Sequence, residues 1–254
     1  MVYKKIEKML KSIFLTTAGI IIRVVLIYTW LIAFGICSEE LDTIPALVCG
    51  LLLIIVFYFV HVRAKLPKKW TYDRLKFTKP KYSYLLFILV LFKVIGDFFW
   101  IFHIKTSQST FTDDPIDVLV LAVIAFPLVE EFGFRLWLQT YLETKINKII
   151  AVLSISIFFS FIHANDIPVS QLLSSIFYGI ILIKTKSVWW PIFMHVLHNA
   201  LIVSLDNISY IKTLAFILMD RQDNLNLIIA ILFWILSGFG LLMWIKFNNE
   251  KIKL

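Results

Sequence analysis

The sequence contains few of the residues that make turns, linkers and crosslinks. Its 254 residues include only 8 Gly, 7 Pro and 2 Cys. Two cysteines are too few for a disulfide framework, and the low glycine and proline content excludes a fibrous or low-complexity chain. Charged residues are also scarce at 17%, compared with about 25% in a soluble domain. Of the whole sequence, 60% is hydrophobic, including 23 Phe, which is too apolar for a soluble protein.

Long apolar runs account for most of the chain. A helix that crosses a bilayer needs about 20 mostly apolar residues. Eight runs are candidates, of which the fifth and sixth are the shortest: 13–37, 44–62, 83–104, 117–142, 149–164, 169–183, 188–206 and 226–245. No segment between them is long enough to fold separately. The sequence therefore predicts an all-α, polytopic membrane protein, with residues 1–254 as a single membrane domain of about eight transmembrane helices.

The net charge of +8 would suit a nucleic-acid partner, but the basic residues follow a different pattern. Cytoplasmic loops of membrane proteins are enriched in Lys and Arg. If the N-terminus is cytoplasmic, the eight predicted spans leave 19 of the 25 Lys and Arg on the cytoplasmic side. This sorting predicts that both termini are cytoplasmic. It also makes the lipid bilayer, and not a nucleic acid, the expected partner.

Ionisable residues inside predicted spans are costly and usually functional. In the fourth span, Glu131 and Arg135 are four residues apart and can form an ion pair along one helix face. Glu130 points about 100° away from that face. A carboxylate left facing a cavity can act as a general base, and Pro127 can kink the helix to open space beside it. The alternative is that both acids are structural and bond to neighbouring helices.

Polar residues on two further predicted spans lie at depths similar to that of Glu130. With a rise of 1.5 Å per residue, Glu130 and Asn199 both lie about 20 Å from the cytoplasmic ends of their helices, and His163 lies about 22 Å from its own. His195 is shallower, at about 14 Å, but it shares a helix face with Asn199. His198 lies beside them. The sequence predicts that three helices bring these groups to one site near mid-membrane.

Two other ionisable residues, Lys93 and Asp97, are four apart on the third predicted span. They can neutralise each other along one face of that helix. We therefore expect a structural ion pair in the interior of the bundle.

A carboxylate, two imidazoles and a carboxamide admit two chemistries, both of which hydrolyse peptides. In the first, Glu130, His163 and His195 bind a divalent metal such as zinc and leave one position open for water. In the second, Glu130 and His195 deprotonate a water molecule without a metal, while His163 and Asn199 donate hydrogen bonds to the developing oxyanion. No Ser or Cys has an obvious base partner.

These residues form three motifs that resemble those of the CPBP family, the CAAX-protease and bacteriocin-processing (Abi) intramembrane endopeptidases. The family pattern is E-E-x-x-x-R, then F-x-x-x-H, then H-x-x-x-N/D. The matching residues are Glu130, Glu131 and Arg135, then Phe159 and His163, then His195 and Asn199. Leu136 departs from the pattern, because the family often has Gly after the motif Arg, but it removes no catalytic group.

The resemblance implies an eight-helix fold with a catalytic core over about 117–206. It implies that Glu130 is the catalytic acid/base and that Glu131 and Arg135 support the site. It also implies that His163, His195 and Asn199 position the water and stabilise the oxyanion. Of the two routes, we favour the one that requires no cofactor. In the metal route, the zinc ligands would be Glu130, His163 and His195.

The expected activity is cleavage of a membrane-associated peptide or protein. The family resemblance implies processing of prenylated proteins for a eukaryotic or archaeal member, and peptide maturation, bacteriocin self-immunity or surface-protein regulation for a bacterial one. The Lys-, Ile-, Phe- and Asn-rich composition is typical of an AT-rich bacterium, which favours the bacterial roles and the bacterial plasma membrane. One alternative is a non-enzymatic immunity or regulatory protein that binds a partner. Another, a proton-coupled transporter, is disfavoured because the chain has no inverted repeats.

Overall fold

The computed structural model describes residues 73–104, 118–163, 168–207 and 223–249, together with scattered positions between 18 and 56. Every element in the four longer ranges is helical, which confirms the all-α prediction for this part of the chain. The elements are α4 (Ser83–Ile104), η1 (Val118–Ala125), α6 (Phe126–Glu130), η2 (Glu131–Gln139), α7 (Thr140–Glu143), α8 (Lys148–Ile162), α9 (Pro168–Thr185), α10 (Trp189–Asn207) and α12 (Asp223–Asn249).

The helices agree closely with the predicted spans. The third predicted span has the bounds of α4, and the fourth corresponds to the consecutive segments from η1 to α7. Among the described residues, two helices could cross a membrane by length and composition, over Ser83–Ile101 and Leu225–Asn248, while α8, α9 and α10 are shorter apolar helices. The first two predicted spans lie mostly outside the described residues. The number of eight spans and the side of the termini therefore stay predictions.

The segment that carries Glu130 is a continuous helix with an unusual turn geometry. The turns of η1 and η2 are wide, π-type turns, and the short α-helical segment α6 separates them. Pro127 is buried at the start of α6, where its missing N–H interrupts the hydrogen-bond ladder. Turns of π type are rare and are frequently found at functional sites. All nine residues of η2 are buried, so this segment runs through the interior of the bundle.

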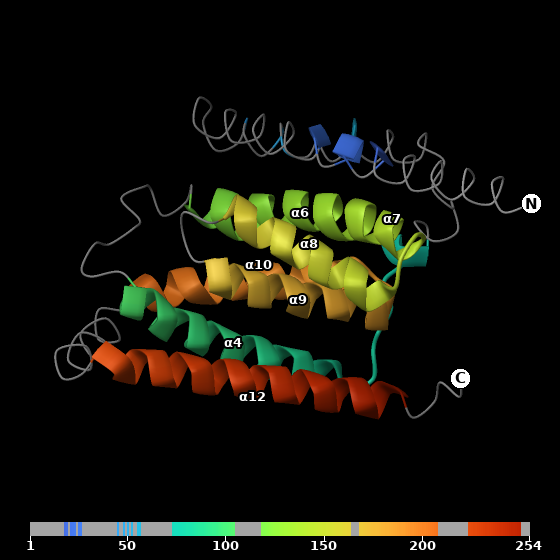
Figure 1. The fold of residues 1–254 in the computed structure, drawn as a ribbon. Coiled ribbons are helices and arrows are strands. Elements are labelled where there is room, and N and C mark those ends of the chain that lie inside the picture. Colours follow the sequence, from blue (N-terminus) through green and yellow to red (C-terminus); the bar gives the residue numbers. More distant parts are fainter. Residues whose placement is uncertain are drawn as a thin grey trace, which may run out of the picture.

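The helices form layers with α9 and α10 in the middle (Figure 1). On one side, α4 packs along α12 and against α10, around a core that includes Leu86, Val94, Met194 and Trp244. On the other side, the helix from η1 to α7 packs with α8 around Phe134, Trp137, Ile155 and Phe159. The middle helices therefore contact both cores, and α10 lies against η1 and α6 as well as against α4.

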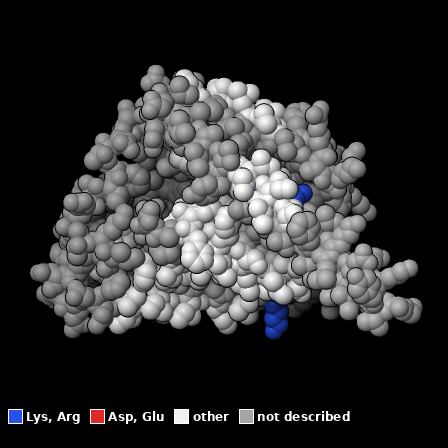
Figure 2. All heavy atoms as spheres, turned by 45° about the horizontal axis from the view of Figure 1, so that its top comes forward, with Lys and Arg blue, Asp and Glu red and all other residues white. Residues whose placement is uncertain are grey.

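The outer surface carries many large apolar side chains. On α12 the exposed residues recur at helical spacing: Ile228, Ile231, Leu232, Ile235, Phe239 and Leu242. The described residues on the face drawn in Figure 2 are almost all uncharged. A soluble protein rarely exposes so much contiguous apolar surface, whereas lipid tails would cover it. This surface agrees with the membrane location expected from the composition.

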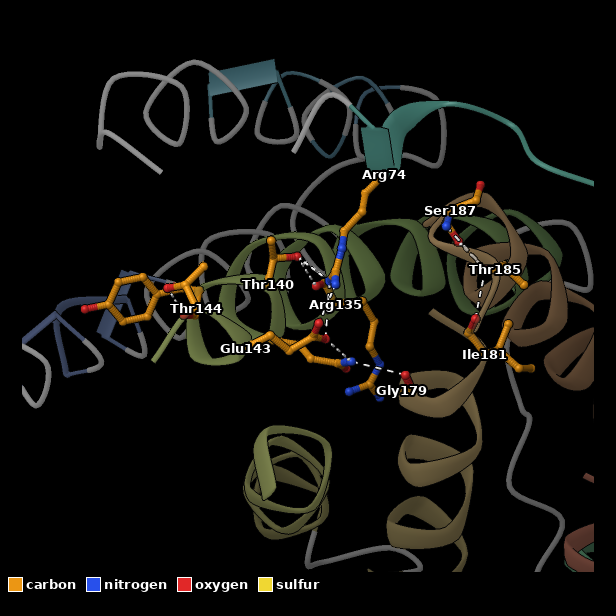
Figure 3. A network of polar contacts seen from close by, with 11 residues as sticks. Arg74, Arg135, Thr140, Glu143, Thr144, Gly179, Ile181, Thr185 and Ser187 are labelled. Atoms are coloured by element: carbon orange, nitrogen blue, oxygen red, sulfur yellow. Dashed lines mark hydrogen bonds and ion pairs between the residues drawn. The ribbon is translucent and has the colours of Figure 1, made fainter. Parts of the chain in front are cut away.

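One end of the bundle is held together by the segment before α4. The Arg74 guanidinium forms an ion pair with Glu143 and donates a hydrogen bond of 2.8 Å to Thr140 Oγ1 (Figure 3). The Arg74 carbonyl accepts from the backbone of Val188 at 2.9 Å, next to the start of α10. A cavity at this end is lined by Asp73, Arg74, Glu143, Lys148, Ile183 and Lys186. The segment before α4, the loop between α7 and α8 and the loop between α9 and α10 thus meet at one end of the bundle.

Candidate active site

A buried ion pair forms the base of the candidate site. The Glu131 and Arg135 side chains are fully buried, and Arg135 Nε lies 3.2 Å from Glu131 Oε2. The predicted pair at i,i+4 is therefore confirmed. Arg135 Nη2 also donates a hydrogen bond of 2.7 Å to Ser175 Oγ on α9. These contacts fix the rotation of the helix and leave Glu130 on a different face.

Glu130 lies between two histidines that come from two other helices. Its Oε1 is 3.5 Å from His163 Nε2, and its Oε2 is 3.8 Å from His195 Nε2. The Glu130 residue is only 8% exposed. The structure thus brings together three of the four predicted catalytic residues, with one imidazole on each carboxylate oxygen. Separations of this size are longer than a normal direct hydrogen bond.

His163 is held by the phenylalanine of its own motif. It follows the last residue of α8, where its Nδ1 lies 2.9 Å from the Phe159 carbonyl oxygen. A carbonyl can only accept, so Nδ1 carries the hydrogen. The two rings also pack against each other, with centroids 4.4 Å apart and their planes tilted by 32°. Phe159 in turn packs edge-on against Phe134 in the core. The spacing of four residues in this motif therefore turns His163 Nε2 toward Glu130.

His195 is oriented by Glu131 and by an aromatic ring. Its Nδ1 lies 3.0 Å from Glu131 Oε1, so Glu131 contacts both Arg135 and His195. The Tyr178 ring of α9 stacks on the imidazole with centroids 4.8 Å apart and an interplanar angle of 23°. The imidazole is therefore fixed with Nδ1 on Glu131 and Nε2 toward Glu130.

Asn199 lies one helical turn beyond His195. Its Nδ2 donates a hydrogen bond of 2.8 Å to the Ala122 carbonyl of η1, and its Oδ1 lies 3.2 Å from His198 Nδ1. None of the contacts of the described residues joins Asn199 directly to Glu130. Asn199 is thus close to the segment that leads to Glu130, but it is not in the cluster of three.

The predicted depths of Asn199 and His195 relative to Glu130 are wrong. The depth estimate placed Asn199 level with Glu130 and His195 shallower, whereas His195 is the residue of α10 that approaches Glu130. The estimate assumed an α-helical rise of 1.5 Å for every residue. The wide turns of η2 advance less along the axis per residue, so Glu130 lies nearer the end of its helix than the estimate gave.

The predicted Lys93–Asp97 ion pair is confirmed. The pair is not self-contained, however, because Asp97 Oδ2 also lies 2.6 Å from His198 Nε2 and Trp234 Nε1 donates to Asp97 Oδ1 at 2.8 Å. This link and the stacking of Tyr178 were not predicted. Neither has a signal in the sequence, because the contacting residues are far apart along the chain.

The metal route requires three protein ligands that are grouped around one ion. Among the residues that the structure describes, no group of three or more His, Cys, Asp or Glu side chains could hold a metal ion. The two Nε2 atoms approach different oxygens of Glu130, at 3.5 and 3.8 Å.

A buried carboxylate flanked by two oriented imidazoles supplies groups that are suited to general acid–base catalysis. The model of the family described as type II CAAX prenyl endopeptidase Rce1-like matches residues 112–201. This range contains all three motifs, and the match agrees with the family resemblance that the motifs predicted. No curated protein and no solved structure matches the chain.

Proposed function

We propose that the protein hydrolyses a peptide bond of a membrane-associated peptide or protein, with Glu130 as the base that activates water. The observation that carries this proposal is the burial of Glu130 between His163 Nε2 and His195 Nε2, each on an imidazole whose Nδ1 is already engaged. Such pre-organised groups lower a barrier because little reorientation is needed during the reaction.

The charges of the site suggest different protonation states for the two histidines. Glu130 and Glu131 carry two negative charges, and Arg135 supplies one positive charge. A buried site is most stable when its charges balance, which requires one more proton. We place it on His163, whose Nε2 would then donate a hydrogen bond. His195 would stay neutral, with its hydrogen on Nδ1 facing Glu131 and a lone pair on Nε2.

The reaction follows from this arrangement. Glu130, assisted by the Nε2 lone pair of His195, removes a proton from a water molecule, and the water oxygen attacks the peptide carbonyl carbon. Negative charge develops on the carbonyl oxygen, where His163 and Asn199 donate hydrogen bonds. The carbon–nitrogen bond then breaks, and the proton held by Glu130 passes to the leaving amine. The products are a new carboxylate and a new amine.

The bilayer is part of the proposal because the substrate must reach a buried site. The exposed apolar side chains on α12 and α4 would be covered by lipid tails. A peptide anchored at the membrane would approach the site from within or beside the bilayer. We place the protein in a bacterial plasma membrane, with a role in peptide maturation, bacteriocin self-immunity or surface-protein regulation.

The test compares peptide N-termini in membranes and culture medium of cells that carry the wild type or Glu130→Gln at matched expression. Glutamine has nearly the size of glutamate but cannot take a proton. We expect new N-termini with the wild type alone, and these would identify the substrate and the cleaved bond. Asp73→Asn is a matched control, because it also neutralises an acid, but at an exposed position outside the candidate site. It should preserve the wild-type profile.

The result that would overturn the proposal is an identical set of N-termini in the wild type and Glu130→Gln. If Glu130→Gln also restored the phenotype of a null strain, the function would be the binding of a partner, as in the non-enzymatic alternative. The metal-free route is tested separately with purified wild-type protein. Cleavage that persists in a strong chelator supports it, and cleavage that stops until zinc is restored contradicts it.

A further inference from the structure

His198 is the one histidine of α10 that faces away from Glu130. It lies inside the third motif, between His195 and Asn199, but it is not one of the residues that define that motif. Each of its two ring nitrogens contacts a polar side chain. Nε2 lies 2.6 Å from Asp97 Oδ2 on α4, and Nδ1 lies 3.2 Å from Asn199 Oδ1 on α10 itself. An imidazole engaged at both nitrogens has a fixed position.

The amide of Asn199 has a defined orientation. Its Nδ2 lies 2.8 Å from the Ala122 carbonyl, which can only accept a hydrogen bond. The nitrogen must therefore point toward η1, and the oxygen must point toward His198. An amide oxygen also only accepts, so His198 Nδ1 must carry a hydrogen and donate it. The contact with His198 thus supports the same orientation of the Asn199 amide that the Ala122 carbonyl sets.

Asp97 anchors the other side of His198. Since His198 Nδ1 carries a hydrogen, a second proton must lie between Nε2 and Asp97 Oδ2 to avoid two facing lone pairs. Asp97 is only 1% exposed, and its two oxygens also accept from Lys93 and from Trp234 Nε1. The carboxylate is therefore held by α4 itself and by α12. It cannot rotate away without the loss of several buried hydrogen bonds.

We propose that His198 is a positioning residue for Asn199, anchored through the Asp97 carboxylate. The chain of contacts runs from Trp234 and Lys93 through Asp97 and His198 to the Asn199 amide. One amide hydrogen of Asn199 is used by Ala122, and the other is held toward the developing oxyanion. His198 itself touches no reacting atom. This inference rests on the proposed function, because it assigns the orientation of one oxyanion donor in that reaction.

The test uses two substitutions that each imitate one ring nitrogen. The amide nitrogen of asparagine lies as far from Cα as Nδ1 of histidine, and that of glutamine lies as far as Nε2. His198→Asn can therefore donate to Asn199 but cannot reach Asp97. His198→Gln can reach Asp97 but no longer donates to Asn199. In both variants, Asp97 keeps Lys93 and Trp234 as partners, so neither leaves a buried charge unpaired.

We expect kcat on the identified substrate to fall about 10- to 100-fold in His198→Gln, with KM nearly unchanged, because a misplaced donor weakens the transition state and not substrate binding. His198→Asn should keep kcat close to that of the wild type. If His198 only ties α10 to α4, the order is reversed: His198→Gln keeps both activity and thermal stability, and His198→Asn loses both. That order would overturn the proposal.

A double-mutant cycle separates positioning from general damage. In an Asn199→Ala background there is no amide to orient, so His198→Gln should cause no further loss of kcat. A further loss equal to that in the wild-type background would contradict the proposal. Glu130→Gln is measured in parallel. If Glu130→Gln is as active as the wild type, the proposed function fails as well; if it is inactive and His198→Gln is fully active, only the positioning role fails.

Discussion

The buried Glu131–Arg135 pair offers the sharpest test of the site's energetics. Replacing Arg135 by Gln removes the guanidinium that lies 3.2 Å from Glu131 Oε2 and that donates to Ser175 Oγ at 2.7 Å. Both members of the pair are fully buried, so solvent cannot replace the lost charge. Breaking such a pair by removing one partner costs about 3–5 kcal/mol. Since domains are typically stable by only about 5–15 kcal/mol, the variant should lose a large part of its stability.

The assay is reversible unfolding in mixed micelles, with the free energy of unfolding measured for four proteins. These are the wild type, Arg135→Gln, Glu131→Gln, and the double variant Glu131→Gln/Arg135→Gln. The double variant removes both charges, so its loss should be clearly smaller than the sum of the two single losses. If the free energy of unfolding that the double variant loses equals the sum of the two single losses, the two charges are not coupled. That result would refute the reasoning.

Two further predictions concern packing. A Cβ at Gly179 would lie 2.9 Å from Val152 Cγ1 and 3.1 Å from a buried glutamine oxygen, so Gly179→Ala should lower the free energy of unfolding by about 1–3 kcal/mol. A Cβ at Gly238 would have no atom within 4 Å, so Gly238→Ala should raise the free energy of unfolding by up to about 1 kcal/mol. Equal effects of the two substitutions on thermal unfolding would contradict this prediction. Tyr178→Phe keeps the ring that stacks on His195, so its kcat should equal that of the wild type. Tyr178→Leu removes the ring and should lower kcat about 10-fold, because the His195 imidazole is then less firmly held. Equal kcat values for the two variants would contradict the stacking role.

Most of the helical framework could be predicted because hydropathy depends only on local sequence. The apolar run 83–104 matches α4 at both ends, and the run that begins at residue 226 lies inside α12. The ends of α12 extend further, to Asp223 and Asn249, because polar residues can continue a helix beyond the apolar stretch. The wide turns on both sides of α6 have no comparable signal in the sequence.

The site was predictable where its geometry is periodic. Glu131 and Arg135 pair as their spacing indicates, and Phe159 lies under His163 for the same reason. Contacts between helices were not predictable in detail. Lys93 and Asp97 were expected to neutralise each other, yet Asp97 also holds His198, a residue 101 positions away. Such contacts depend on helix rotation and packing, which a pattern within one helix does not contain.

The most direct test of the central claim is hydrolysis by the purified protein in lipid nanodiscs with solvent water labelled with oxygen-18. The substrate is a peptide that spans the bond identified from the cellular N-termini. Mass spectrometry of the products measures both cleavage and the label in the new carboxylate. We predict that wild type and Asp73→Asn release a product with the label, and that Glu130→Gln releases none above the uncatalysed level. Cleavage by Glu130→Gln at the wild-type rate would contradict the account.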